Sequence, residues 1–94
     1  MITISRLTCP RSAVMDQRGF ELTYIARVYE GDPNTYCPEG VPCAWDVQPS
    51  RELRDWVRSK PSYMAYSHSL MEDQSHIEIY LTEKDAILFK LYWM

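Results

Sequence analysis

Apolar and polar residues alternate along several short stretches of the chain, as they do in β-strands that bury one face. The clearest stretch is residues 20–30, in which every second position is apolar: Phe20, Leu22, Tyr24, Ala26 and Val28. Residues 1–8 show a shorter version of this pattern. Residues 62–70 and 76–82 are two further strand-like stretches on either side of the polar segment 71–75, so we predict that they pair as an antiparallel hairpin.

Residues 50–60 have the periodicity of a helix. Leu53, Trp56 and Val57 are three and four positions apart in sequence and would share one face. Ser50 offers a side-chain oxygen as an N-cap, and Pro61 prevents the helix from continuing.

The last stretch, residues 83–93, is apolar enough to be either a helix or a buried strand. Thr82 can cap a helix, and Glu83 and Asp85 would lie in its first turn, where the helix dipole favours acidic side chains. We therefore predict a helix, with four apolar residues on one broad face: Ala86, Phe89, Leu91 and Trp93.

A third, short helix is predicted within residues 9–19, because Pro10 is suited to a first helical position and Gly19 to a helix end. Together the elements predict an α+β fold, in which a small antiparallel sheet carries two or three helices packed on one face.

Residues 31–49 interrupt this regular pattern. They contain four of the six prolines and two of the three glycines. Proline lacks an amide proton and restricts the residue before it, so we predict a long loop that forms neither helix nor strand. Long ordered loops are often functional, which makes this loop a candidate contact surface within a single domain of residues 1–94.

Composition narrows the class of protein. The chain has 94 residues, of which 46% are hydrophobic, enough for one packed core. Its net charge of −3 does not indicate a general nucleic-acid binder. No stretch approaches the roughly 18 apolar residues needed to span a bilayer, and the N-terminus lacks the pattern of a signal peptide. An odd number of cysteines, three, fits a reducing compartment, so we expect a cytoplasmic protein.

The cysteines give no clear metal or redox motif. Cys37 and Cys43 are spaced more widely than the cysteines of a zinc knuckle or a redox pair. Cys9, His68 and His76 could complete a metal site only if the fold gathered them, so we predict no metal and no cofactor. A Cys37–Cys43 disulfide is sterically possible and the sequence leaves it open, although reduced cysteines are the favoured interpretation.

No motif for nucleophilic, phosphate-binding or metal-dependent catalysis occurs in the chain. Glu72 and Asp73 lie between His68 and His76, and a solvated hairpin turn accounts for this arrangement. We therefore predict that the protein is not an enzyme.

Aromatic residues and arginines are the better indication of function, because both are enriched at protein–protein hot spots. Two aromatic residues lie in the loop and three arginines lie along one face of the following helix. The predicted partner-binding residues are Tyr36, Trp45, Arg51, Arg54 and Arg58.

The alternative is that the three arginines, together with Lys60, bind the phosphates of a nucleic acid. Against this alternative, Glu52 and Asp55 lie on the same helix and would offset the arginines by i,i+3 and i,i+4 pairing.

The C-terminal sequence HIEIYLTEKDAILFKLYWM, residues 76–94, combines an alternating strand, an acidic E-x-D-A helix start and an F-K-L-x-W ending. In these features it resembles the C-terminus of small accessory proteins of tailed bacteriophages, and also the strand-to-helix step of ferredoxin-like domains. The phage resemblance implies a protein that acts in the cytoplasm of an infected bacterium. Such proteins commonly bind and inhibit a host enzyme or a defence system, anti-CRISPR inhibitors among them, which implies a small non-enzymatic inhibitor acting by steric occlusion.

Overall fold

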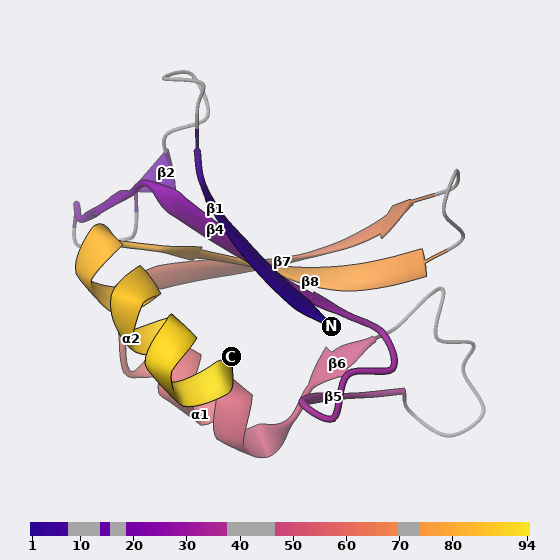
Figure 1. The fold of residues 1–94 in the computed structure, drawn as a ribbon. Coiled ribbons are helices and arrows are strands. Elements are labelled where there is room, and N and C mark those ends of the chain that lie inside the picture. The colour runs from indigo at the N-terminus through magenta and orange to yellow at the C-terminus, as the bar shows by residue number, and fades with distance from the viewer. Residues whose placement is uncertain (8–13, 16–18, 38–46, 70–73) are drawn as a thin grey trace.

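Four antiparallel strands form the main sheet, in the order β1 (Ile2–Arg6), β4 (Tyr24–Tyr29), β8 (Gln74–Leu81) and β7 (Ser62–Ser69) (Figure 1). This computed structural model describes residues 1–7, 14–15, 19–37, 47–69 and 74–94. Within these residues there are two helices, α1 (Arg51–Arg58) and α2 (Glu83–Trp93). The α+β class and the antiparallel sheet predicted from the sequence are thus confirmed, with two helices in the described part of the chain.

The strand β8 lies between β4 and β7 although it follows both in sequence. Since β8 is antiparallel to each neighbour, β4 and β7 run parallel to one another, and the connection between them carries α1. Strands β7 and β8 form the hairpin that the sequence predicts, with Ser62 opposite Leu81 and Ser69 opposite Gln74. The order leaves β1 and β7 at the two edges of the sheet.

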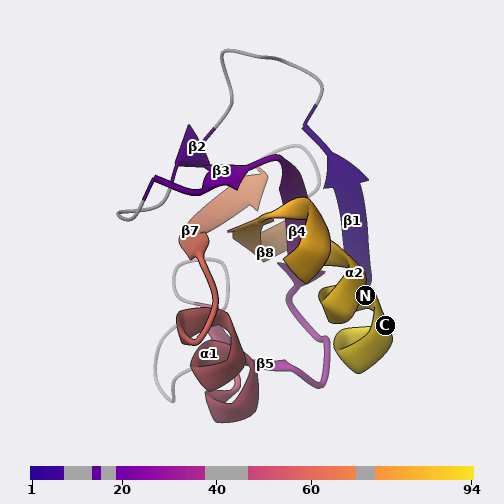
Figure 2. The same cartoon turned by 90° about the vertical axis from the view of Figure 1, so that its left-hand side faces the viewer.

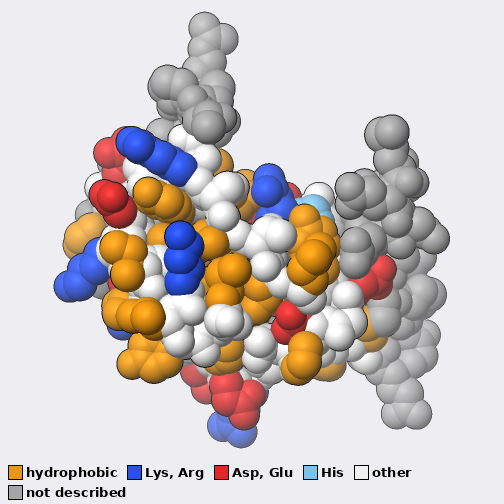
Figure 3. All heavy atoms as spheres, in the orientation of Figure 1, with side chains coloured by type: hydrophobic (Ala, Val, Ile, Leu, Met, Phe, Trp, Pro, Cys, Tyr) orange, Lys and Arg blue, Asp and Glu red, His pale blue; other side chains and the backbone are white. Residues whose placement is uncertain are grey.

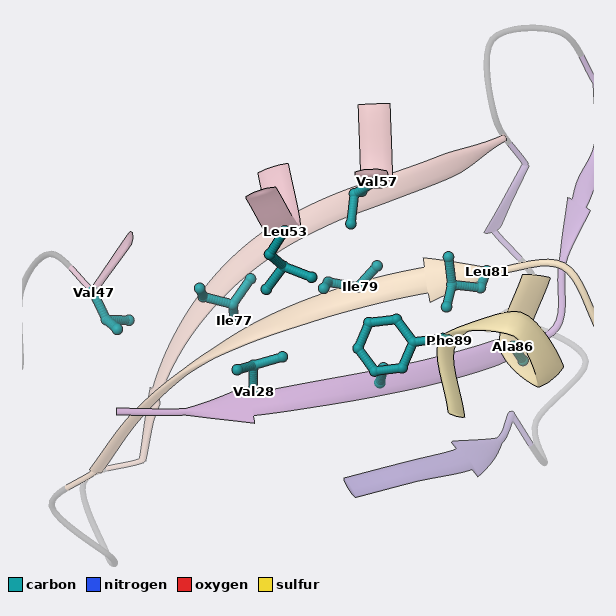
Figure 4. Close-up of a cluster of buried hydrophobic side chains, with 10 residues drawn as sticks. Val28, Val47, Leu53, Val57, Ile77, Ile79, Leu81, Ala86 and Phe89 are labelled. Carbon is teal, nitrogen blue, oxygen red and sulfur yellow. The ribbon is translucent and has the colours of Figure 1, made fainter. Parts of the chain in front are cut away.

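The hydrophobic core lies between one face of the sheet and the two helices. On β8 the three residues Ile77, Ile79 and Leu81 are fully buried, and on the neighbouring β4 Ala26 and Val28 are fully buried too. The cluster also takes in residues from α1, α2 and the segment before α1: Val47, Leu53, Val57, Ala86 and Phe89. Figure 4 shows Leu53 and Phe89 on opposite sides of β8, next to its buried residues. In Figure 2, α1 lies below β7 and α2 lies beside β4 and β1.

Local chemistry explains where the helices begin. The side-chain oxygen of Ser50 accepts a hydrogen bond from the amide of Leu53, and that of Thr82 accepts one from the amide of Asp85. Both predicted N-caps are therefore confirmed, as is the helix over residues 83–93 in place of the alternative strand. Neither described helix is long and apolar enough to cross a membrane.

One part of the prediction for α2 is wrong, because Leu91 is 76% exposed and does not share the buried face. Leu91 follows Phe89 by two residues, which places it roughly 200° around the helix. The inward residues Ala86, Phe89 and Trp93 are instead spaced by three and four positions, and they pack against the core.

The N-terminal region differs from the prediction in a second way. Val14–Met15 forms a short strand, β2, that pairs with β3 (Glu21–Leu22), so the predicted helix does not include these residues; 9–13 and 16–18 lie outside the described residues. The predicted strand over 20–30 is divided at Thr23, where the chain changes its pairing from β2 to β1 and β8.

The proline-rich segment 31–49 also contains two short strands that the sequence did not predict. β5 (Thr35–Tyr36) pairs with β6 (Gln48–Pro49), and the residues between them, 38–46, lie outside the described residues. Proline is compatible with a strand this short because a missing amide proton is tolerated at a sheet edge.

The N-terminal ammonium is tied to this segment. It lies 2.9 Å from a carboxylate oxygen of Asp32, which is itself only 8% exposed. Burial alone would raise the pKa of Asp32, but hydrogen bonds from Asn34 and from the ammonium lower it below its ordinary value. The start of β1 is therefore held against the turn that follows β4.

A pair of substitutions in α2 tests this core. We expect Phe89→Leu to lower the free energy of unfolding by about 1–2 kcal/mol, because it removes volume from a site with no exposed surface. Leu91→Ala, on the exposed side of the same helix, should change it by less than about 0.5 kcal/mol. Urea unfolding followed by circular dichroism measures both, and equal losses would contradict the assigned helix orientation.

Candidate functional site

Four of the five predicted binding residues line one open pocket of about 510 Å³ beside α1. The four are Tyr36, Arg51, Arg54 and Arg58. Pro49 and Asp55 complete the lining among the described residues. Trp45, the fifth predicted residue, lies outside the described residues. The structure thus brings together the loop tyrosine and the arginine row that the sequence singled out.

A second pocket, of about 360 Å³, adjoins the first because Arg54 and Arg58 line both. This pocket extends from α1 to Lys60 and to three alternate residues of β7, Ser62, Met64 and Tyr66. We call Arg51, Arg54, Arg58 and Lys60 the basic surface. It runs from the β5–β6 hairpin along α1 to the edge of the sheet.

Short-range contacts hold the ends of the basic surface in place. The β5–β6 pairing sets Tyr36 opposite Gln48, whose side-chain oxygen accepts a hydrogen bond from Arg54 at 3.3 Å. At the other end, the hydroxyl of Ser62 donates to the carbonyl of Val57 at 2.7 Å and ties the start of β7 to α1. The surface is therefore built on ordered elements at both ends.

The basic surface forms no ion pair with the described acidic residues of α1. In the described part of the chain, no carboxylate lies within 4.0 Å of its arginines or lysine, so the predicted pairing with Glu52 and Asp55 is not formed. Asp55 is the one acidic side chain among the described residues that line the two pockets. Lys60 instead lies 5.5 Å from the centre of the Trp56 ring, a cation–π arrangement.

Cys37 follows β5 directly and is disulfide-bonded, which corrects the favoured interpretation of reduced cysteines. The other cysteines, Cys9 and Cys43, lie outside the described residues. Sequence spacing alone could not decide this point because pairing depends on the distance between cysteines in the folded chain. The described residues contain no group of three or more side chains arranged to hold a metal ion.

The sheet face turned away from the helices carries a polar network that the sequence did not identify. The hydroxyl of Tyr80 donates to one oxygen of Glu78 at 2.8 Å, and Nε2 of His76 lies 3.1 Å from the other. The His76 ring also packs against Tyr29, and Tyr80 packs against Tyr63 of the neighbouring strand. The period of two in β8 placed these residues on one face, but only the cross-strand register shows which side chains meet.

This network shifts the acidity of two of its members. Burial raises the pKa of Glu78, but hydrogen bonds from Tyr80 and His76 outweigh it and bring the pKa below its ordinary value. Burial and the adjacent Glu78 carboxylate raise the pKa of Tyr80. None of the three side chains is among the described lining of either pocket. Glu72 and Asp73, which the sequence places in a solvated hairpin turn, lie outside the described residues.

A third surface feature is the outward face of α2. Ile87, Leu91 and Met94 are each more than half exposed, and Figure 3 shows hydrophobic side chains gathered over this helix. Lys84 and Lys90 are exposed on the same helix and are not among the described residues that line the two pockets.

Comparison with known proteins identifies no relative of this chain. No protein-family model, no curated protein and no solved structure matches the chain. The geometry of the surfaces described above is therefore the main basis for a functional proposal.

The acidity of Glu78 gives a test of the sheet-face network. In Tyr80→Phe the carboxylate loses one of its two hydrogen bonds, so its pKa should rise toward the ordinary value. Because the folded-state pKa of Glu78 is lowered, its contribution to stability is present above the pKa of the unfolded chain and is lost as pH falls through the lowered value. Tyr80→Phe should thus cost about 1 kcal/mol at neutral pH and less in acid.

Carboxyl NMR titration and unfolding at several pH values measure these two effects. Tyr63→Phe is the matched control, because it removes a hydroxyl from the ring that packs on Tyr80 and leaves the Tyr80–Glu78 hydrogen bond in place. An unchanged Glu78 titration in Tyr80→Phe would show that the hydroxyl does not stabilise the carboxylate.

Proposed function

We propose that the protein is a small non-enzymatic binding protein that recognises an acidic surface of another protein. The observation that carries this proposal is the basic surface, on which four cations flank two adjoining pockets and make no ion pair with any described carboxylate. Guanidinium groups that form no ion pair with a described carboxylate and lie next to an aromatic ring are well suited to bidentate recognition of carboxylates.

Tyr36 supports the same interpretation. It is 49% exposed and lines the pocket with the arginines, so its ring is available to a partner and is not part of the core. Tyrosine and arginine together supply apolar area and directed hydrogen bonds at low conformational cost, as binding hot spots commonly do.

The resemblance of residues 76–94 to accessory proteins of tailed bacteriophages supports a more specific proposal. On that resemblance, the partner is a protein of a bacterial host or of a defence system such as CRISPR. Binding through the basic surface would then inhibit this partner by steric occlusion, since the mechanism requires only that the chain cover a site that another molecule needs.

Nucleic acid is the alternative partner, because the same unpaired arginines could bind phosphates. The net charge of −3 opposes it, since acidic residues elsewhere on the chain would repel a long polyanion. If a single-stranded nucleic acid is the partner, binding should weaken with salt with a log–log slope of about −0.7 per contacted phosphate.

Charge reversal on α1 tests the proposal. The double variant Arg51→Glu, Arg58→Glu should lose at least about 90% of partner capture from a bacterial lysate, because like charges then face the acidic partner. Its melting temperature should stay close to that of the parent chain, since both side chains are exposed. Immobilised chain, quantitative mass spectrometry and thermal unfolding provide the measurements.

The matched control is Lys84→Glu, Lys90→Glu, which makes the same change of charge on the exposed surface of α2. It should capture the same proteins as the parent chain. Equal capture by the α1 variant and the parent would refute the assignment of the basic surface, as would capture that disappears after nuclease treatment.

A further inference from the structure

The strand β7 lies at one edge of the main sheet. It has eight residues, Ser62–Ser69, and β8 is its one partner among the described strands. In an antiparallel pair, every second residue directs its N–H and C=O away from its partner strand. Within the described part of the chain, no backbone hydrogen bond joins β7 to any segment other than β8.

The sequence of this edge lacks the features that normally prevent pairing with another chain. Edge strands are commonly protected by lysine, other charged residues or proline, yet SYMAYSHS contains none of these. Two tyrosines of β7 are instead exposed, Tyr63 at 52% and Tyr66 at 55%. Because their positions differ by three residues, one tyrosine lies on each face of the strand.

The pocket beside this edge is strongly basic. Tyr66, Met64 and Ser62 line it from β7, and Arg54, Arg58 and Lys60 line it from α1 and the residues after it. Among the described residues, no acidic side chain lines this second pocket. A strand added beside β7 would therefore present alternate side chains to three cations on one face and to Tyr63 on the other.

We propose that β7 binds an extended segment of a partner protein by β-strand addition, with acidic residues at the alternate positions that face Arg54, Arg58 and Lys60. This inference rests on the proposed function and adds that the partner binds through an extended segment of its chain. The exposed backbone of β7 supplies affinity through main-chain hydrogen bonds, and the basic pocket supplies specificity through charge.

The same charges argue against a second copy of this chain as the occupant. Two β7 strands paired antiparallel about a two-fold axis would place both α1 helices on the same face of the joined sheet. Each copy would then bring its own Arg54, Arg58 and Lys60 toward those of the other, and like charges would oppose one another.

A peptide series tests the proposal directly. The probe is a fluorescent eight-residue peptide in which Glu alternates with Val, so that its carboxylates lie on one face when it is extended. We expect it to bind the full chain with a Kd below about 1 mM, and the same peptide with Lys in place of Glu should not bind. Arg58→Glu, Lys60→Glu should weaken binding at least about 10-fold, while Lys84→Glu, Lys90→Glu should leave it unchanged.

Backbone methylation distinguishes strand addition from simple charge attraction. Two further peptides carry N-methyl groups on all Glu amides or on all Val amides, so each blocks one edge of the peptide strand. One methylated peptide should lose binding and the other should retain it, because only one edge faces β7.

Four results would contradict the proposal. If both methylated peptides bind as well as the parent peptide while Arg58→Glu, Lys60→Glu still weakens binding, the basic surface recognises charge alone and the proposed function stands without strand addition. If the parent peptide does not bind, an acidic extended segment is not the ligand of β7. The same holds if sedimentation shows a dimer that forms through β7 and prevents the peptide from binding. Stronger binding of single-stranded oligothymidylate than of the Glu–Val peptide would favour nucleic acid instead.

Discussion

The burial of one face of β8 is the constraint on which the rest of this structure depends. Ile77, Ile79 and Leu81 have no exposed surface, and their neighbours come from strands on both sides and from both helices. Each fully buried aliphatic side chain stabilises the fold by roughly 1.5–3 kcal/mol, so this face contributes much of what a chain of 94 residues can gain from its core. The order of the strands and the positions of the helices together bury this face of β8.

The polar network and the basic surface both follow from the same constraint. A period of two sends His76, Glu78 and Tyr80 to the face opposite the helices, where they form a network with one another. Because β8 lies between β4 and β7, β7 lies at the edge of the sheet. Since α1 covers the core beside β7, its outward arginines come to lie along that edge. A chain with a net charge of −3 can in this way present a local surface of opposite sign.

Local sequence signals predicted most of the fold. Ser50 and Thr82 marked both helix starts, and alternation marked β4, β7 and β8. The prediction failed where long-range pairing decides the outcome. Val14 and Met15 form a strand because residues 21–22 pair with them, and β5 exists because β6 lies opposite to it. Propensity in a window of a few residues contains no information on such partners.

The candidate site was predictable to a similar extent. The spacing of Arg51, Arg54 and Arg58 on one helix face is visible in the sequence, and so is the position of Tyr36 before that helix. Lys60 is likewise visible in the sequence, just after this row. The involvement of the β7 edge was not visible, because it depends on the path of the chain after α1. The helix likewise gave no sign that its arginines would form no ion pair with a described carboxylate, since Glu52 and Asp55 have spacings compatible with ion pairs.

Residue-resolved amide hydrogen exchange under native conditions would test the central claim, that β8 is the buried middle strand and β7 a free edge. If the account is correct, amides throughout β8 exchange slowly, because both neighbours bond to this strand. Amides of β7 should alternate between slow and fast exchange from one residue to the next, because only every second N–H is bonded to β8. Uninterrupted protection along residues 62–69 would contradict the account, since it would require another segment to pair with the outer side of β7.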